Sequence, residues 1–195
     1  VRDMAIQNIA VLGAGQMGNG ITQVAAAAGY NVTMIDIQQE YVDKGLATIE
    51  RSLSKLVSKE RMSQEDADAT LARISLSTDR ADCADCDLVV EAVPEIVDLK
   101  TSIFAELDSI CKPETILASN TSSISISTIA DATNRPDKVI GMHFMNPVPI
   151  MKLVEVINGN KTSSETNAAV IEASEKMGKI ALSCNDSPGF VSNRI

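Results

Sequence analysis

The chain of 195 residues contains no tryptophan, a single histidine and few aromatic residues, which make up 3% of the sequence. Its core must therefore be built from aliphatic side chains, and buried aliphatic strands with Ala-rich helices are typical of α/β proteins. Basic residues are also scarce, because 17 of them face 26 acidic residues and the net charge is −9. An acidic surface repels phosphate backbones, so we expect no nucleic-acid partner.

Long apolar runs are missing as well. No run reaches the roughly 18 residues of a membrane span and no signal-peptide pattern is present, so we expect a soluble, cytoplasmic protein without a membrane partner. Cys83 and Cys86 form a C-x-x-C, but no second pair and no nearby histidine complete a zinc site. We therefore expect no metal, and expect these two cysteines, Cys111 and Cys184 to be free thiols.

Strand-like and helix-like segments alternate along almost the whole chain. Strands are predicted at 8–12, 31–36, 74–77, 87–92, 115–119, 139–143, 152–157 and 179–183, and helices at 17–28, 42–59, from 63 onward, 99–110, 124–132 and 166–177. This order predicts a Rossmann-type, doubly wound and mostly parallel sheet. The two polar helices that begin at 42 and 63 predict an inserted helical hairpin that stands off the sheet. We expect one domain over 1–185, and over 186–195 a linker and the start of a missing C-terminal helical domain.

A glycine motif lies between the first predicted strand and the first predicted helix. Gly13-Ala14-Gly15-Gln16-Met17-Gly18 matches G-x-G-x-x-G, which is specific only in this strand–turn–helix context. Gly13 permits the tight turn, Gly15 lets a pyrophosphate approach the backbone, and Gly18 lets the helix pack closely on the strand. The N-terminus of the helix then faces the pyrophosphate. The motif predicts a dinucleotide site.

Asp36 ends the second predicted strand, where a carboxylate can accept hydrogen bonds from the adenosine ribose. The same charge repels a 2′-phosphate, and the following Ile37, Gln38 and Gln39 include no arginine to receive one. We therefore expect NAD rather than NADP. The alternative is a strand-end turn with an ordinary helix cap, but the order of strand, glycines, helix, strand and acid favours the dinucleotide site.

His143 is the only histidine, and it falls at the C-terminal end of a predicted strand, the edge where open α/β sheets bind ligands. Histidine titrates near neutral pH, so it can take the hydroxyl proton when a secondary alcohol is oxidised. Glu155 lies in an otherwise apolar strand, where a carboxylate is costly to bury without a partner. If the two strands are neighbours, Glu155 can fix the imidazole tautomer. The alternative, a core-edge histidine and a surface glutamate, remains equally open from the pattern.

Ser119-Asn120-Thr121-Ser122-Ser123 follows another predicted strand end. Its hydroxyl and amide groups can hold a substrate oxygen or the nicotinamide ribose. They can equally cap the next helix, and the spacing does not decide between these roles.

Five stretches together resemble one family. They are I-A-V-L-G-A-G-Q-M-G-N-G-I at 9–21, L-V-V-E-A-V-P-E at 88–95, A-S-N-T-S-S-I-S-I at 118–126, G-M-H-F-M-N-P-V-P-I-M-K-L-V-E-V-I at 141–157 and D-S-P-G-F-V-S-N-R-I at 186–195. They are similar to the NAD-binding N-terminal domain of 3-hydroxyacyl-CoA dehydrogenases, including bacterial 3-hydroxybutyryl-CoA dehydrogenases. The H-F-x-N-P block, with a glutamate twelve residues after its histidine, is more specific than the glycine motif.

The resemblance implies an oxidoreductase of fatty acid metabolism that interconverts a short-chain (S)-3-hydroxyacyl-CoA and a 3-oxoacyl-CoA with NAD. It implies His143 as the catalytic base, Glu155 as its partner, and Ser122 and Asn193 as contacts to the substrate's 3-oxygen. The cofactor residues it implies are Gly13, Gly15, Gln16, Met17, Gly18, Asp36, Glu95, Lys100 and Asn146. It also implies that Ser52 and Lys59, on the hairpin, contact coenzyme A. Without the resemblance, the basic residues around Lys59 indicate a solvated helix face instead.

Members of this family continue into a helical domain that forms the homodimer and closes the cleft, so the resemblance implies that such a domain follows residue 195. Two alternatives remain. The chain is an NAD-binding module with little or no turnover, or it oxidises a free hydroxy acid and its hairpin is only structural.

Overall fold

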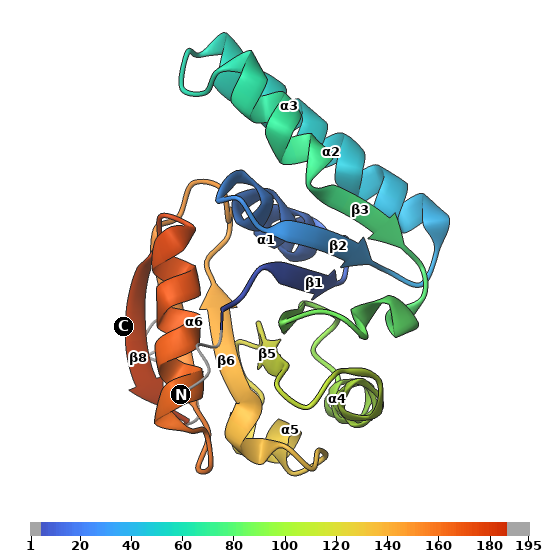
Figure 1. Cartoon of the computed structure of the whole chain (residues 1–195), viewed down its shortest axis with the longest axis vertical. Helices are drawn as coiled ribbons and strands as arrows, with labels where there is room; N and C mark the ends of the chain where they lie inside the picture. The colour runs from blue at the N-terminus through green and yellow to red at the C-terminus, as the bar shows by residue number, and fades with distance from the viewer. Residues whose placement is uncertain (1–4, 187–195) are drawn as a thin grey trace.

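The computed structural model describes residues 5–186. Within this range the strands form one sheet in the order β3-β2-β1-β4-β5-β6-β7-β8 (Figure 1). The strands are β1 (Asn8–Leu12), β2 (Asn31–Ile35), β3 (Ile74–Ser77), β4 (Leu88–Glu91), β5 (Ile116–Ser119), β6 (Val139–Phe144), β7 (Leu153–Asn158) and β8 (Ile180–Asn185). The helices are α1 (Gln16–Ala27), α2 (Gln39–Ser58), α3 (Gln64–Ala72), α4 (Val97–Ile110), α5 (Ile126–Ala130) and α6 (Ser164–Lys176), with 3-10 turns η1 (Arg80–Cys83) and η2 (Pro136–Lys138).

All neighbouring strands in this sheet are parallel except β6 and β7, which pair antiparallel. The predicted doubly wound, mostly parallel sheet is confirmed. Because parallel strands end at the same edge, the segments after β1, β2, β4, β5 and β6 gather at one side of the sheet. The sequence analysis predicted the candidate site residues at this edge.

The helices cover both faces of the sheet. One face packs against Ile21 of α1 and Val170 of α6, and the other packs against Phe104 and Leu107 of α4 and Ile129 of α5. Both layers consist mainly of Val, Ile, Leu and Ala, as the shortage of aromatic residues predicts. A core of this kind holds the strand ends rigidly, which fixes the positions of the residues that follow them.

The predicted boundaries differ from the observed ones mainly at helix starts. Helix α2 begins at Gln39, three residues before its predicted start, directly after the turn at the end of β2. Helix α5 covers only 126–130 instead of 124–132, because Ser125 caps it: the Ser125 hydroxyl accepts from the Thr128 N–H at 3.3 Å. The 3-10 turns η1 and η2 were not predicted.

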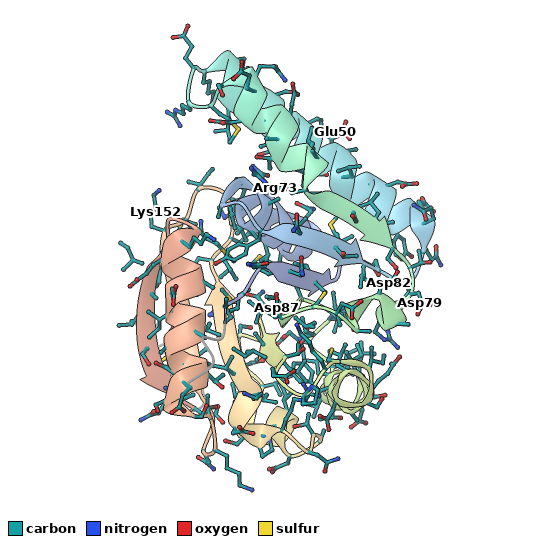
Figure 2. The ribbon with its side chains drawn as sticks, in the orientation of Figure 1. Glu50, Arg73, Asp79, Asp82, Asp87 and Lys152 are labelled. Atoms are coloured by element: carbon teal, nitrogen blue, oxygen red, sulfur yellow. The ribbon has the colours of Figure 1, made fainter. Side chains whose placement is uncertain are left out.

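The inserted hairpin is confirmed, but its near half packs on the core rather than standing free. Val42, Ile49 and Leu53 of α2 form a cluster with Met34 of β2. Figure 2 shows Arg73, at the end of α3, beside α1, and its guanidinium donates to a carbonyl oxygen of α1 at 2.8 Å. The far end of the hairpin extends away from the sheet (Figure 1).

The cysteines are free thiols, as expected, and Cys83, Cys86 and Cys111 are buried. Burial raises the pKa of Cys86 and of Cys111 to about 11, so these thiols stay protonated and poorly nucleophilic at neutral pH. Within residues 5–186, no group of His, Cys, Asp and Glu side chains is arranged to hold a metal ion. No helix in the same range has the length and apolarity needed to cross a membrane.

Candidate cofactor and active site

A cavity of about 820 Å³ opens at the sheet edge where β1, β2, β4, β5 and β6 end. Open α/β sheets bind their ligands at this edge. Ten of the residues implied by the resemblance line the cavity: Gly13, Gly15, Gln16, Met17, Asp36, Glu95, Lys100, Ser122, His143 and Asn146. Segments far apart in the sequence therefore build one site.

The three glycines of the turn differ in why a side chain is excluded or allowed. Gly13 has a φ of +107°, and a Cβ on it would lie 2.6 Å from the carbonyl oxygen of Ala92. A Cβ on Gly18 would lie 1.9 Å from the carbonyl oxygen of Gly13, so α1 packs on the turn itself. A Cβ on Gly15 would meet nothing within 4 Å. The open space thus lies at the first residue before α1, where the helix N-terminus can receive a pyrophosphate, and the residues fit a dinucleotide.

The Asp36 carboxylate is hydrogen-bonded to this turn. Its Oδ2 accepts from the Ala14 N–H at 2.8 Å, and its Oδ1 accepts from the Ile37 N–H at 2.7 Å. Each carboxylate oxygen keeps a further lone pair, which a ribose hydroxyl can use. Asp36 and the glycine turn are therefore held in a fixed relation.

The structure adds an arginine that the sequence pattern did not reveal. No arginine follows Asp36 directly, but Arg80 of η1 lines the same cavity, together with Asp36 and Ile37. Its guanidinium donates to Glu106 Oε2 from two nitrogens, at 2.8 and 2.9 Å. Two of its five N–H donors are thus already used by this carboxylate.

His143 and Glu155 lie directly opposite each other in the antiparallel β6–β7 pair. The imidazole Nδ1 is 3.1 Å from Glu155 Oε1, and His143 is 9% exposed while Glu155 is fully buried. The expectation that these strands are neighbours is confirmed, and the alternative of a surface glutamate is wrong. A buried carboxylate needs a partner, and the imidazole supplies one.

The segment from Ser119 to Ser123 holds the end of β5 against its neighbours. The Asn120 Oδ1 accepts from the Phe144 N–H at 2.8 Å, next to His143. The Thr121 hydroxyl donates to Glu95 Oε2 at 2.7 Å, and the Ser123 hydroxyl donates to the same oxygen at 3.0 Å. Ser125, outside this segment, caps α5, so the helix-capping alternative is wrong. Ser122 lies in the cavity wall.

Partial burial acts to raise the pKa of Glu95, but hydrogen bonds from Lys100, Thr121 and Ser123 outweigh it and lower this pKa below its usual value. Glu95 is therefore ionised at neutral pH, and it brings a negative charge to the wall of the cavity.

Several expected residues lie elsewhere. Gly18 and Glu155 are buried behind the residues that line the cavity. Ser52 lies in α2 and Lys59 directly after it, and neither lines the cavity. Asn193 lies outside the described residues.

The sequence pattern did not single out Glu91 or Arg80, and it indicated Asn120 only as part of the segment 119–123. Asn120 and Arg80 line the cavity, and Glu91 is buried directly behind it. One signal was available for Glu91, because it is a carboxylate inside an apolar strand, as Glu155 is.

The strand order, the glycine turn before α1 and the acid after β2 define a dinucleotide-binding protein of the Rossmann class. The chain belongs to the 3-hydroxyacyl-CoA dehydrogenase family, because residues 8–187 match its NAD-binding domain. NAD, the cofactor expected from the sequence, is the cofactor of that domain.

Similar proteins support this membership. A probable 3-hydroxybutyryl-CoA dehydrogenase of Deinococcus radiodurans is 56% identical over 95% of the chain, and one of Bacillus subtilis is 50% identical over 98%. The chain spans 66% and 67% of the lengths of these two relatives. The crystal structure of (S)-3-hydroxybutyryl-CoA dehydrogenase from Ralstonia eutropha matches with a TM-score of 0.96 and 48% identity, over 98% of this chain and 68% of that one.

Proposed function

We propose that the chain carries the cofactor and catalytic site for NAD-dependent oxidation of a short-chain (S)-3-hydroxyacyl-CoA to the 3-oxoacyl-CoA, and for the reverse reaction. The observation that carries this proposal is His143, backed by Glu155 at 3.1 Å, in the wall of the cavity that also contains the glycine turn. When bound there, NAD supplies the acceptor for the hydride of the secondary alcohol. The protein then has to bind and orient the substrate and accept one proton from its hydroxyl group.

His143 is the proposed general base. The Glu155 carboxylate accepts from the imidazole Nδ1–H, which leaves the second ring nitrogen, Nε2, to take the hydroxyl proton. The resulting imidazolium is stabilised by the buried carboxylate. Ser122, in the same cavity wall, is proposed to donate a hydrogen bond to the substrate's 3-oxygen.

The hairpin is the proposed contact for coenzyme A. Its helix α2 starts at the cavity, because Tyr41 near its N-terminus lines the wall. Lys59, directly after the last residue of α2, is exposed, so its ammonium group can meet a phosphate of the substrate. Ser52, about two helical turns earlier on α2, is proposed to assist.

The test is incubation with acetoacetyl-CoA and NADH, followed at the absorbance band of the reduced cofactor. We expect loss of this band only when the thioester is present, and no loss with free acetoacetate. If NADH binds but neither compound is turned over, the chain acts as an NAD-binding module. If free acetoacetate reacts as well as the thioester, the coenzyme A assignment is wrong.

Asp36→Ala is expected to lower NADH affinity by about 10- to 100-fold, the effect of losing one or two hydrogen bonds to a charged group. The affinity for NADPH should fall less or rise, because the charge that repels a 2′-phosphate is removed. Titration with both cofactors measures this change. Asp43→Ala, which removes an exposed carboxylate outside the cavity wall, is the control. If NADH keeps its full advantage over NADPH in Asp36→Ala, the ribose is recognised elsewhere.

Lys59→Ala is expected to raise the KM for acetoacetyl-CoA by about two- to fivefold, which is the range of an exposed ion pair. The kcat and the affinity for NADH should not change, since Lys59 does not line the cavity. Steady-state kinetics at low and high salt measure the effect, which should fade as salt rises. Lys44→Ala, an exposed lysine on the first half of the same helix, is the control, and an equal rise in KM there would contradict a specific contact.

A further inference from the structure

A group of three charges, two of them buried, lies between the cavity and the sheet. Glu91 ends β4 and is fully buried, and Lys100 of α4 is 1% exposed. The Lys100 Nζ lies 2.6 Å from Glu91 Oε2 and 2.9 Å from Glu95 Oε1. Glu95 is the outer member, because its side chain is 40% exposed and lines the cavity.

Hydrogen-bond donors surround the Glu91 side chain. Glu91 accepts from the Val93 N–H at 2.8 Å and from the Ser119 hydroxyl at 2.6 Å, besides Lys100, and all three partners are donors. A carboxylate needs this arrangement, since it can only accept. The three protons of the Lys100 ammonium point to Glu91, Glu95 and the Val93 carbonyl oxygen at 3.1 Å.

We propose that Glu91 is a positioning residue of the cofactor site: it neutralises Lys100, so that the charge of Glu95 reaches the nicotinamide end of the cavity and favours oxidised over reduced cofactor. The three side chains sum to one negative charge. Without Glu91, the charges of Lys100 and Glu95 would cancel. Oxidised nicotinamide carries a positive charge and reduced nicotinamide carries none, so only the oxidised form gains from a net negative charge nearby.

The network places Glu95 next to the residues that would surround the reacting ring. Thr121 and Ser123, the two neighbours of Ser122 in the chain, both donate to Glu95 Oε2. Ser119, at the start of the same segment, donates to Glu91, and the Asn120 side chain continues the network to the backbone beside His143. The inference rests on the proposed function only in placing the nicotinamide at this end of the cavity.

The test measures dissociation constants for NAD⁺ and NADH, without turnover, in Glu91→Gln. Glutamine has nearly the same shape: its side-chain oxygen can still accept from Val93 and Lys100, while its amide nitrogen would face the Ser119 oxygen as a donor, so the variant removes mainly the charge. We expect the ratio of the NAD⁺ constant to the NADH constant to rise by about three- to tenfold, as one unit charge several ångströms away allows in a partly solvated site. An unchanged ratio would overturn the proposal.

A double variant separates charge from structure. Glu91→Gln with Lys100→Gln removes one charge of each sign, so Glu95 again provides a net negative charge, and the ratio should return to that of the unaltered chain. A ratio that stays as high as in Glu91→Gln would show that Glu91 acts only through packing.

The chain offers a matched control in Asp108→Asn. Asp108 and Arg135 form another largely buried pair, with 2.6 Å between Asp108 Oδ1 and the Arg135 Nε, and neither residue lines the cavity. This variant should lower the melting temperature but leave the ratio unchanged, and a shift equal to that of Glu91→Gln would contradict the proposal. Because only binding is measured, the result does not depend on whether a hydroxyacyl thioester is turned over.

Discussion

Replacing His143 with glutamine is expected to lower kcat by about 100- to 10,000-fold, the range that general acid–base catalysis contributes. Glutamine can still face Glu155 across the β6–β7 pair, but it cannot take up a proton near neutral pH. The affinity for NADH should change little, because the hydrogen-bonding groups at the glycine turn and at Asp36 remain in place. Turnover of acetoacetyl-CoA and fluorescence titration with NADH measure the two quantities on the same preparation.

A companion variant, Glu155→Gln, tests the second half of the pair. It keeps the side chain's size in a fully buried position but removes the charge that stabilises the imidazolium. We expect a smaller loss of kcat than in His143→Gln, and a double variant that is scarcely worse than His143→Gln alone, since the two residues act as one unit. If His143→Gln retains the original kcat, another group takes the proton. If both variants lose NADH binding in parallel with turnover, the pair is structural.

The sheet could be predicted from the sequence because its central strands β1, β4, β5, β6 and β7 are largely apolar and buried on both faces. Every strand predicted from an apolar run is present, and the first, at 8–12, has the predicted bounds. Helix ends were less accurate, because local side-chain hydrogen bonds decide them. The carboxylate of Asp186, which accepts from the Ile126 N–H at 3.1 Å and the Ser127 N–H at 2.9 Å, adds to the Ser125 cap at the start of α5. A contact over about 60 residues leaves no local pattern.

In the candidate site, too, local patterns could be predicted and long-range contacts could not. Gly13, Gly15, Gly18 and Asp36 form a local strand–turn–helix–strand unit, whose spacing alone predicts the chemistry. His143 and Glu155 required the further assumption that their strands are neighbours, which the antiparallel β6–β7 pair satisfies.

Glu91 carried the same signal as Glu155, a carboxylate within an apolar strand, yet its partners could not be inferred. Lys100 lies nine residues on and Ser119 twenty-eight residues on, at the starts and ends of different elements. Arg80 reaches the cavity only because the crossover from β3 to β4 passes the end of β2. Such contacts depend on how the strands are ordered in the sheet, and the sequence pattern reveals that order only in outline.

The three glycines around α1 are expected to separate cofactor binding from stability. In Gly15→Ala the new methyl group meets no protein atom within 4 Å, and the φ of −69° suits alanine, so stability should change by no more than about 1 kcal/mol. The methyl group does occupy the space through which a pyrophosphate approaches the backbone. We therefore expect NADH affinity to fall by about 10- to 100-fold, because the pyrophosphate would lose one or two hydrogen bonds to the backbone.

Gly29→Ala should show the reverse. Gly29 follows the C-terminal end of α1 with a φ of +106°, so alanine there is strained by about 1–2 kcal/mol, but it lies outside the cavity wall and NADH affinity should not change. Gly18→Ala should show both effects, because its Cβ would lie 1.9 Å from the Gly13 carbonyl oxygen and force α1 away from the turn. We expect a loss of about 1–3 kcal/mol in the free energy of unfolding together with weaker NADH binding. Denaturant titration and NADH titration of the three variants measure both quantities, and a Gly15→Ala chain that binds NADH normally would show that the pyrophosphate does not lie at the N-terminus of α1.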